Sequence, residues 1–600
     1  MQAMGLFSSI QRELTYISTL RRTNEWIKDL SPESTTLLPD HWESICDQNN
    51  PRPAIIFEGK TWTYGQLDGR ANLYAHWAIS IGLKTGDVVA LFMQNRPDYL
   101  AAWYGLAKVG VIVALINHNL QGPSLLHCIT IAKSKAAIIG FELADLWASV
   151  DGQLPDVSIW SSGGVLPHSN DLDRALNAQS NKRPSRAYRE MLLAKDPCLY
   201  VYTSGTTGNP KAACLSHART QALSRSFIAA TKSGPNDRVY CPLPIYHATG
   251  GICAVGLAFN TGATLLLRRR FSATQFWDDI VDQECTIFAY IGEMFRYLVS
   301  APIHPKERSH KLKSCFGNGL RQDVWARAQE RFKIPLIVEF YGSTEGNVGM
   351  ANIDGKLGAV GRIPSYLKKK FNVELVRFDF EHEKPLRNED GFCERCGVDE
   401  VGEAIGRIDD DNIRARFDGY ANDRAGSDKK LLRDVFEYGD LWFRTGDLLR
   451  QDKLGYFYFV DRIGDTYRWK SENVSTNEVG EVLCMFPGID QANVYGVDVP
   501  HTDGRAGMAV ILASELLDLE ALSTYVRSEL PGFAVPVFLR FQPEMDITGT
   551  FKYRKLELVN EGFNPSQIHD PIVWMNPDTQ LYEPLTAQVY DAIQSGHIRF

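Results

Sequence analysis

The sequence predicts an α/β protein with two domains, a large N-terminal domain with mostly parallel sheets flanked by helices and a small C-terminal domain. Six hundred residues are too many for a single hydrophobic core. From Ala54 onward, short apolar strands alternate with amphipathic helices, which is typical of parallel sheets covered by helices. After Gly455 the strand-like run 456–460 leads into the charged, glycine-bearing segment 461–465. We therefore expect the domain boundary at this segment.

Residues 1–50 form the first expected part, an amphipathic N-terminal segment. Apolar residues recur mostly every three or four positions between Leu6 and Leu30, with basic residues among them. This spacing predicts one or two amphipathic helices. The helices can pack on their own domain, or they can lie in a membrane interface if their apolar side chains stay exposed. Both alternatives remain open at this point.

The N-terminus has no pattern of a secretory signal, because Arg12 and Glu13 interrupt the apolar run. We therefore expect a cytoplasmic protein, with peripheral attachment to the inner face of a membrane as the alternative. The uncharged segment 249–267 contains the turn-like sequence 260–262, so it divides into helix, turn and strand. No membrane span is expected.

Within the large domain, residues 51–461, local signals define the first helix and its neighbouring strands. Thr63 and Gln66 form a capping box, and Gly82 ends the helix that it starts. Further strands and a second helix follow, and these elements are the strands 88–92, 111–115 and 199–202 and a helix from Pro97. Residues 154–187 are rich in Ser, Asn, Pro and Asp without periodicity, which predicts a long surface connection.

The composition excludes several classes of protein. Hydrophobic residues make up 44% and charged residues 23%, as in soluble enzymes with sizeable cores. The 64 basic and 72 acidic residues give a net charge of −8, so no nucleic-acid partner is expected. The 11 cysteines are scattered in apolar runs and read as buried free thiols of a reducing compartment. Cys393 and Cys396 form a lone Cys-x-x-Cys pair without the further ligands that a zinc site needs.

The octapeptide 204–211 directly follows the buried strand 199–202 and combines hydroxyls, glycines and Lys211. Glycine lets the backbone approach an anion, hydroxyl and amide groups donate hydrogen bonds to phosphate oxygens, and lysine adds charge. The loop is not a Walker loop, because Pro210 precedes the lysine and Ala212 follows it. A polar surface hairpin is the alternative for such a loop taken alone. The full string favours a polyphosphate site.

A second motif, Tyr341-Gly342-Ser343-Thr344-Glu345, follows the apolar strand 336–338. Strand ends are where α/β sheets place ligands. An aromatic ring can stack on a purine, a hydroxyl can reach a phosphate, and a carboxylate can hold magnesium against it. The nearby Gly317-Asn318-Gly319 can present bare backbone to a planar base. The alternative is a purely structural role as a capped turn at a strand end.

A third motif, Trp442-Phe443-Arg444-Thr445-Gly446-Asp447, ends on an acidic residue. A carboxylate can accept paired hydrogen bonds from vicinal hydroxyls, so ribose binding is chemically sensible. Arg462 is a permanent donor that can complete the sugar contact. Thr-Gly-Asp alone is a common turn, and the strand and Asp-Arg sequence that follow make the binding interpretation stronger.

Together these segments resemble the signatures of the adenylate-forming superfamily of acyl-CoA synthetases, luciferases and peptide-synthetase adenylation domains. Residues 461–475 and the tail 569–600 resemble its fatty acid transport protein and very-long-chain acyl-CoA synthetase branch. The amphipathic start is more like bacterial long-chain fatty acid–CoA ligases than like eukaryotic members, which begin with a membrane span. The resemblance implies an adenylate-forming N-terminal domain and a small, mobile α+β C-terminal domain, residues 462–600, with a hinge near 461–465.

The resemblance also implies roles for individual residues. The ATP- or AMP-binding set is Thr203, Ser204, Gly205, Thr206, Thr207, Gly208, Lys211, Gly317, Asn318, Gly319, Tyr341, Gly342, Ser343, Thr344, Asp447 and Arg462. The catalytic set is Lys552, Glu345, Thr344 and His247, with Glu345 as the metal ligand and His247 as a positioning or gating residue. The hinge and CoA-side set is Gly464, Trp469, Lys470, Ser471, Glu472 and Asn473.

The activity that the resemblance implies is ligation of a long-chain or very-long-chain fatty acid to CoA, with Mg²⁺ and with ATP and CoA as co-substrates. Three alternatives remain open: a fatty acyl-AMP ligase that loads a carrier protein, a lipid uptake protein with secondary ligase activity, and an ATP-binding regulator. The sequence leaves the chain length of the acid and the oligomeric state open, with a dimer as one arrangement.

Overall fold

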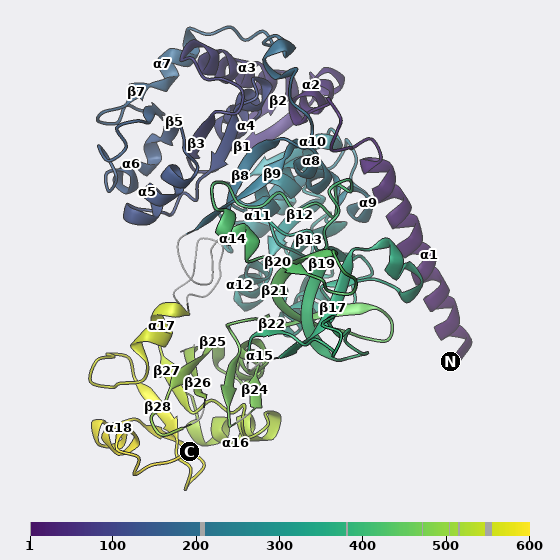
Figure 1. Ribbon diagram of the computed structural model, residues 1–600. Helices are drawn as coiled ribbons and strands as arrows, with labels where there is room; N and C mark the ends of the chain where they lie inside the picture. Colours follow the sequence, from purple (N-terminus) through teal and green to yellow (C-terminus); the bar gives the residue numbers. More distant parts are fainter. Residues whose placement is uncertain are drawn as a thin grey trace. The chain divides into compact units, whose positions relative to one another are not determined.

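The computed structural model describes residues 2–203, 210–379, 382–470, 472–502, 504–513, 517–545 and 555–600. The chain forms two compact units (Figure 1). The first unit comprises residues 1–320, 324–373 and 405–445, and the second comprises residues 321–323, 374–404 and 446–600. The second unit thus draws on more than one segment of the chain, while the hinge near 461–465 stays a prediction.

The first unit contains a seven-stranded sheet in the order β7-β6-β5-β3-β4-β8-β9. All its pairs are parallel except β8 with β9. The strands are β3 (Val88–Phe92), β4 (Ile112–Leu115), β5 (Ala136–Gly140), β6 (Ser158–Ser162), β7 (Asn170–Asp171), β8 (Pro197–Thr203) and β9 (Lys211–Ser216). Alternate residues of β3 pack into two separate cores, Val89 and Leu91 on one face and Ala90 and Phe92 on the other. Both faces of this sheet are therefore covered, as expected for a parallel α/β sheet.

A second sheet of the first unit has eight strands in the order β15-β14-β13-β12-β10-β11-β1-β2. Its central strands are parallel, and antiparallel strands β2 and β15 lie at its edges. The strands are β1 (Pro53–Phe57), β2 (Lys60–Thr63), β10 (Arg238–Cys241), β11 (Thr264–Leu267), β12 (Ile287–Ile291), β13 (Ser314–Asn318), β14 (Ile337–Gly342) and β15 (Gly349–Asn352).

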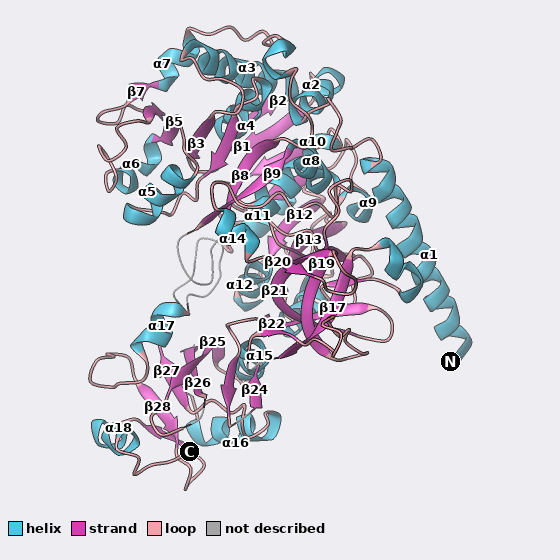
Figure 2. Cartoon of the chain, viewed as in Figure 1, coloured by secondary structure: helices cyan, strands magenta, loops and turns pink. Residues whose placement is uncertain are grey.

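Helices surround these sheets (Figure 2). They are α1 (Gln2–Ile27), α2 (Leu38–Asn49), α3 (Tyr64–Ser80), α4 (Pro97–Lys108), α5 (Gly122–Ile131), α6 (Ala144–Trp147), α7 (Leu172–Asn177), α8 (His217–Arg225), α9 (Ile228–Thr231), α10 (Val255–Asn260), α11 (Phe276–Asp282), α12 (Gly292–Ser300), α13 (Gln322–Phe332) and α14 (Arg424–Asp428). The predicted capping box is confirmed, because Thr63 accepts a hydrogen bond from the Gln66 backbone N–H and Gln66 accepts one from that of Thr63.

The central part of the chain is mostly strand. The elements there are β16 (Gly361–Arg362), β17 (Val373–Asp379), β18 (Lys384–Pro385), β19 (Val401–Arg407), β20 (Leu431–Arg433), β21 (Leu441–Gln451) and β22 (Tyr456–Arg462). Strands β21 and β22 are antiparallel.

The C-terminal part is α+β, which agrees with the fold class that the resemblance implied. Its five-stranded sheet has the order β25-β26-β27-β28-β29, with β26 and β27 parallel and the other pairs antiparallel. The elements are β23 (Tyr467–Trp469), β24 (Glu472–Val474), α15 (Thr476–Met485), β25 (Ile489–Asp498), β26 (Arg505–Ala513), α16 (Leu519–Glu529), β27 (Phe538–Phe541), α17 (Leu556–Glu561), β28 (Ile572–Met575), β29 (Tyr582–Pro584) and α18 (Ala587–Gln594).

The prediction that residues 154–187 are only a surface connection is wrong. Strand β6 pairs with β5 from Ser158 to Ser162, and Leu172 and Leu176 of α7 are fully buried. The sequence hides this strand because it lies near the edge of the sheet and carries serines, so the apolar alternation of a strand is missing. Parallel pairing satisfies its backbone groups without an apolar sequence.

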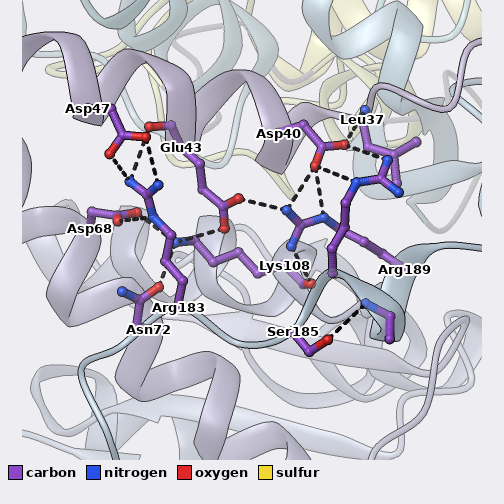
Figure 3. Close-up of polar contacts among 12 residues, drawn as sticks. Leu37, Asp40, Glu43, Asp47, Asp68, Asn72, Lys108, Arg183, Ser185 and Arg189 are labelled. Atoms are coloured by element: carbon purple, nitrogen blue, oxygen red, sulfur yellow. Dashed lines mark hydrogen bonds and ion pairs between the residues drawn. The ribbon is translucent and has the colours of Figure 1, made fainter.

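A buried network of charged residues fastens residues 183–189 to three helices of the first unit (Figure 3). Lys108 of α4 has no exposed surface, and its Nζ lies 2.6 Å from Asp68 Oδ1 and 3.3 Å from Glu43 Oε1. Arg189, also buried, pairs with Glu43 at 2.7 Å. Arg183 bonds to Asp68 at 3.0 Å. The network stabilises a segment that has few apolar side chains of its own.

Helix α1 is one continuous helix with one face packed on the first unit and the other exposed. Tyr16 is buried and donates a hydrogen bond to the carbonyl of Arg362. On the opposite face Ile10, Leu14 and Ile17 are 51%, 64% and 37% exposed. Among the described residues we find no helix long and apolar enough to cross a membrane.

Candidate nucleotide and acyl site

The predicted phosphate loop connects two paired strands of the first unit. Thr203 ends β8 and Lys211 begins β9, and the two residues are register partners across the antiparallel pair. The predicted ligands Ser204, Gly205, Thr206, Thr207 and Gly208 lie outside the described residues. The two ends of the loop are therefore held together by the sheet, as a phosphate-binding hairpin requires.

Lys211 contacts a segment that the sequence did not associate with it. Its Nζ lies 3.7 Å from Asp423 Oδ2 and 5.0 Å from the centre of the Tyr420 ring. A cation over an aromatic face is attracted by the ring quadrupole. Asp423 in turn caps helix α14 by accepting a hydrogen bond from the backbone N–H of Gly426. The predicted phosphate-binding lysine thus has a fixed position beside Tyr420.

The second predicted motif forms a tight turn after β14. The hydroxyl of Ser343 accepts a hydrogen bond from the Gly346 backbone N–H at 3.0 Å, which closes the turn around Thr344 and Glu345. Tyr341, Ser343, Thr344 and Glu345 are partly exposed and Gly342 is exposed, so a ligand can reach them. Glu345 Oε1 accepts a hydrogen bond from the Tyr420 hydroxyl at 3.1 Å. Tyr420 therefore contacts residues of both predicted motifs.

The Gly317-Asn318-Gly319 segment ends β13 beside this turn, and its glycines allow close packing. A Cβ on Gly317 would lie 2.1 Å from the Tyr290 carbonyl oxygen, and Gly319 has a φ of +79°. Below it, the fully buried Glu339 accepts hydrogen bonds from the Tyr290 hydroxyl and from the Leu320 backbone N–H. Burial raises the pKa of Glu339 to about 8. A neutral carboxyl group thus supports the predicted adenine-binding segment at pH 7.

His247 lies at the start of a π-helix, Ala248–Ala254, which the sequence did not predict. Its ring centre is 4.7 Å from that of Tyr246, which in turn lies 4.9 Å from that of His118. Burial lowers the pKa of His118 to about 4. π-Helical turns are rare and occur often at functional sites. The positioning role of His247 stays a prediction.

In the second unit Asp447 and Arg462 are direct neighbours across β21 and β22. Arg462 Nε lies 3.7 Å from Asp447 Oδ1. The buried carboxylate of Asp461 accepts hydrogen bonds from the backbone and hydroxyl groups of Thr476, at 2.6 and 2.9 Å. Burial raises the pKa of Asp461. The structure thus pairs the two residues predicted to bind ribose.

The predicted hinge and CoA-side residues come soon after Arg462 in the sequence. Gly464 has a φ of +90° and open space around its Cβ position, so backbone conformation rather than packing requires glycine there. Trp469 is 2% exposed, whereas Lys470 and Glu472 are exposed. Ser471, the side chain of Asn473 and Lys552 lie outside the described part of the chain. Their roles stay predictions.

Glu345 suits a magnesium ion that is bound together with a nucleotide. In the described part of the chain no cluster of three or more His, Cys, Asp or Glu side chains could hold a metal ion. Mg²⁺ is commonly held by one or two carboxylates and by substrate phosphates rather than by a cage of protein ligands. The partly exposed Glu345 carboxylate meets this requirement.

Comparison with known proteins identifies the family of the chain. The family model described as AMP-binding enzyme matches residues 42–391, and the model of the AMP-binding enzyme C-terminal domain matches residues 478–552. The chain belongs to the AMP-binding enzyme family. The resemblance inferred from the motifs is confirmed.

Relatives of this AMP-binding enzyme include "Long-chain fatty acid transport protein 6" of Mus musculus, which is 42% identical over 92% of this chain and 90% of its own length. "Long-chain fatty acid transport protein 1" of Homo sapiens is 38% identical over 98% of this chain and 92% of its own length. Because the identity is high over nearly full length, this AMP-binding enzyme also belongs with the long-chain fatty acid transport proteins.

Solved structures share the fold of this AMP-binding enzyme. An anthranilate CoA ligase bound to anthranoyl-AMP has a TM-score of 0.75 at 19% identity and covers 89% of this chain and 98% of its own. A Mycobacterium tuberculosis fatty acyl CoA synthetase has a TM-score of 0.62 at 22% identity and covers 88% of this chain and 98% of its own. These similarities support the two-domain α/β fold.

Several residues that contact the predicted motifs of this AMP-binding enzyme were not predicted from the sequence, above all Tyr420, Arg219 and Glu339. Arg219 is 6% exposed and donates hydrogen bonds to the Thr344 and Gly346 carbonyls on either side of Glu345. No local pattern marks these residues, because each acts on a segment distant in the sequence. The only signal for Glu339 is a carboxylate inside the apolar strand β14.

Proposed function

We propose that this AMP-binding enzyme is an ATP-dependent long-chain or very-long-chain fatty acid–CoA ligase that forms AMP. The observation that carries this proposal is the position of Tyr420. Its ring lies under Lys211 of the phosphate loop, and its hydroxyl donates to the predicted magnesium ligand Glu345. Two motifs far apart in the sequence therefore meet at one residue, as a site for the phosphates of ATP requires.

In the first half-reaction a fatty carboxylate oxygen attacks the α-phosphorus of ATP, and the bond to the β-phosphate oxygen breaks. The products are acyl-AMP and pyrophosphate. Lys211 and the loop hydroxyls would hold the departing pyrophosphate, and Lys552 would neutralise charge that develops at the α-phosphate. Bound at Glu345, Mg²⁺ would supply electrostatic stabilisation of the phosphates. Asp447 and Arg462 would bind the ribose.

In the second half-reaction the thiol of CoA attacks the acyl carbon, loses its proton and displaces AMP. We infer that the small domain rotates about Gly464 between the two half-reactions. This rotation would remove Lys552 from the α-phosphate and bring the exposed Lys470 and Glu472 towards CoA. The φ of +90° at Gly464 is compatible with a hinge there.

An apolar cluster next to the nucleotide motifs supports an aliphatic acid as substrate. Phe227 stacks on Phe316 with ring centres 5.0 Å apart and contacts Phe340 at 4.6 Å. Phe316 directly precedes Gly317, and Phe340 directly precedes Tyr341. The names of the relatives, long-chain fatty acid transport proteins, agree with a long-chain acid as the substrate.

We also propose that the protein is cytoplasmic and attaches peripherally to the inner face of a membrane through α1. Ile10, Leu14 and Ile17 are spaced at i, i+4 and i+7 and are exposed on one face of the helix. Arg21 is also exposed and continues the same face, and the exposed Lys28 follows directly after the end of α1 at Ile27. An apolar stripe followed by basic residues suits an anionic lipid surface, where a fatty acid would be found.

A panel of fatty acids from medium to very long chain tests the activity. The full chain is incubated with ATP, Mg²⁺ and each acid, with CoA or with a carrier protein as acceptor. We expect pyrophosphate release that depends on the acid, and thioester formation with CoA. The absence of a thioester with every chain length would refute the proposal, while loading of the carrier alone would favour the acyl-AMP ligase alternative.

A further inference from the structure

We propose that Tyr420 and Arg219 are positioning residues for Glu345 and fix the orientation in which its carboxylate meets a magnesium–nucleotide complex. The inference deepens the proposed function and rests on it for the identity of the ligand. Tyr420 acts on the side chain of Glu345, whereas Arg219 acts on the backbone around it. Neither residue belongs to the motifs that identified the site.

The backbone of Tyr420 is held as an extra partner of strand β9. Ala213 and Tyr420 form an antiparallel bridge, and hydrogen bonds on either side join Cys214 to Gly419 at 2.9 Å and Ala421 to Ala212 at 2.8 Å. Tyr420 is 7% exposed. Because the backbone and the buried ring are both fixed, the position of the hydroxyl is fixed as well. The hydroxyl therefore restrains the one Glu345 oxygen to which it donates.

Arg219 lies in α8 and reaches the turn from inside the protein. Its guanidinium donates to the Thr344 carbonyl at 2.9 Å, to the Gly346 carbonyl, and to the Arg416 carbonyl at 3.2 Å. A planar guanidinium with several donors holds two acceptors in a fixed relative position, which a lysine cannot do. The two carbonyls that flank Glu345 are thereby tied to one rigid group. Arg219 thus fixes the main chain from which Glu345 projects.

The combined effect is to present one carboxylate oxygen of Glu345 in a set direction. Oε1 accepts the hydrogen bond from Tyr420, so a metal ion bound through the other oxygen would meet a side chain that cannot rotate without breaking that bond. Holding a ligand in place before binding lowers the entropy that binding must remove. Removal of either positioning residue should weaken metal-dependent nucleotide binding more than metal-free binding.

The hydroxyl and the ring of Tyr420 have separable roles, which makes the inference testable. The hydroxyl contacts Glu345, whereas the ring contacts Lys211. Tyr420→Phe removes only the first contact, and Tyr420→Leu removes both. Tyr438→Phe is the matched control, because Tyr438 is 83% exposed.

The test is calorimetric titration of the full chain with α,β-methylene-ATP, with Mg²⁺ and with EDTA. For Tyr420→Phe we expect about ten-fold weaker binding with Mg²⁺ and unchanged binding in EDTA, and for Tyr420→Leu weaker binding in both. Electron paramagnetic resonance of Mn²⁺ bound with the nucleotide should show the same loss of metal-dependent affinity for Tyr420→Phe. Equal Mg²⁺-dependent affinity of Tyr420→Phe, Tyr438→Phe and the parent would overturn the inference for Tyr420.

For Arg219 the variant is Arg219→Lys, and its unfolding midpoint is measured beside its affinity. The affinity for the nucleotide with Mg²⁺, divided by the affinity in EDTA, should be smaller for Arg219→Lys than for the parent. A lower midpoint with an unchanged ratio would mean that Arg219 is only structural and would overturn its role. Failure of the proposed function is distinguishable, because the parent would then bind Mg²⁺ and nucleotide with this dependence on Tyr420 but form no acyl-CoA.

Discussion

Arg462 Nε lies 3.7 Å from Asp447 Oδ1, across two strands whose register places the two residues directly opposite each other. This distance between the two atoms is longer than a hydrogen bond. The two vicinal hydroxyls of a ribose can donate hydrogen bonds to a carboxylate and accept them from a guanidinium. The pair therefore has the chemistry of a sugar site, which sequence motifs alone had suggested.

Asp447→Ala should weaken nucleotide binding through the ribose. Loss of hydrogen bonds to a charged acceptor is expected to reduce the affinity for AMP by about ten-fold or more. The parent should prefer AMP over its 2′,3′-dideoxy analogue, and the variant should bind both alike. Calorimetry measures the four affinities. Asp498→Ala, at a carboxylate that is 87% exposed, is the control. An undiminished preference in Asp447→Ala would exclude ribose recognition by Asp447.

Glu339 should make stability depend on pH in the alkaline range. Burial raises the pKa of the folded-state Glu339 to about 8 from the ordinary value of 4.5, so between these two values the folded state holds a proton that the unfolded state has lost. The contribution is fully present below the unfolded pKa and is lost as pH rises through the folded pKa. We expect a loss of about 1 kcal/mol between about pH 7 and pH 9, measured by urea unfolding.

Glu339→Gln is the matched variant for this experiment, because its amide oxygen can still accept the hydrogen bond from the Leu320 N–H. Its amide nitrogen can donate to the Tyr290 hydroxyl oxygen, and the proton of that hydroxyl can then bond to the Val338 carbonyl. The substitution should remove that part of the pH dependence. Glu437→Gln, at an exposed position, should leave the dependence as it is in the parent. If Glu339→Gln and the parent have the same pH profile, the buried neutral carboxyl group is ruled out.

Both the strengths and the gaps of the sequence analysis have physical causes. The strands 88–92 and 112–115 and the helix between them were predictable because their apolar periodicity is strong. Strand β6, which lies between β5 and the edge strand β7, was not, because its serines interrupt the apolar pattern of a strand. Tyr420 was missed because its contact with Glu345 joins residues that only the folded chain brings together. Buried arginines such as Arg219 cannot be told from exposed ones in a sequence.

Lys108→Met should strongly destabilise the first unit. The Nζ of Lys108 lies 2.6 Å from Asp68 Oδ1 and 3.3 Å from Glu43 Oε1. The substitution removes this buried ammonium group and its contacts with both carboxylates. Arg183 and Arg189 still pair with these two carboxylates, so we expect the free energy of unfolding to fall by about 3 kcal/mol, the lower end of the range for a broken buried ion pair. Urea unfolding measures the change. Lys195→Met removes a lysine from a more exposed pair with Glu33 and should have a much smaller effect. Equal effects of the two substitutions would contradict the structural role of the network.

A negative charge on the exposed face of α1 should weaken attachment to anionic lipid vesicles. Leu14→Glu places a carboxylate between Ile10 and Ile17 on the exposed face of α1, where Leu14 is 64% exposed. We expect reduced co-sedimentation with anionic vesicles and an unchanged unfolding midpoint. Met191→Glu, at a side chain that is 87% exposed elsewhere, is the control. Co-sedimentation of Leu14→Glu at the level of the parent would argue against α1 as the lipid contact.

The most direct measurement of the central claim follows the oxygen of the fatty acid. The full chain is incubated with ATP, Mg²⁺, CoA and a long-chain fatty acid labelled with oxygen-18 in its carboxyl group, and the products are weighed by mass spectrometry. If the carboxylate attacks the α-phosphate, acyl-CoA and AMP should each carry one labelled oxygen, and pyrophosphate should carry none. Formation of ADP with labelled phosphate, or of AMP without label, would contradict the account.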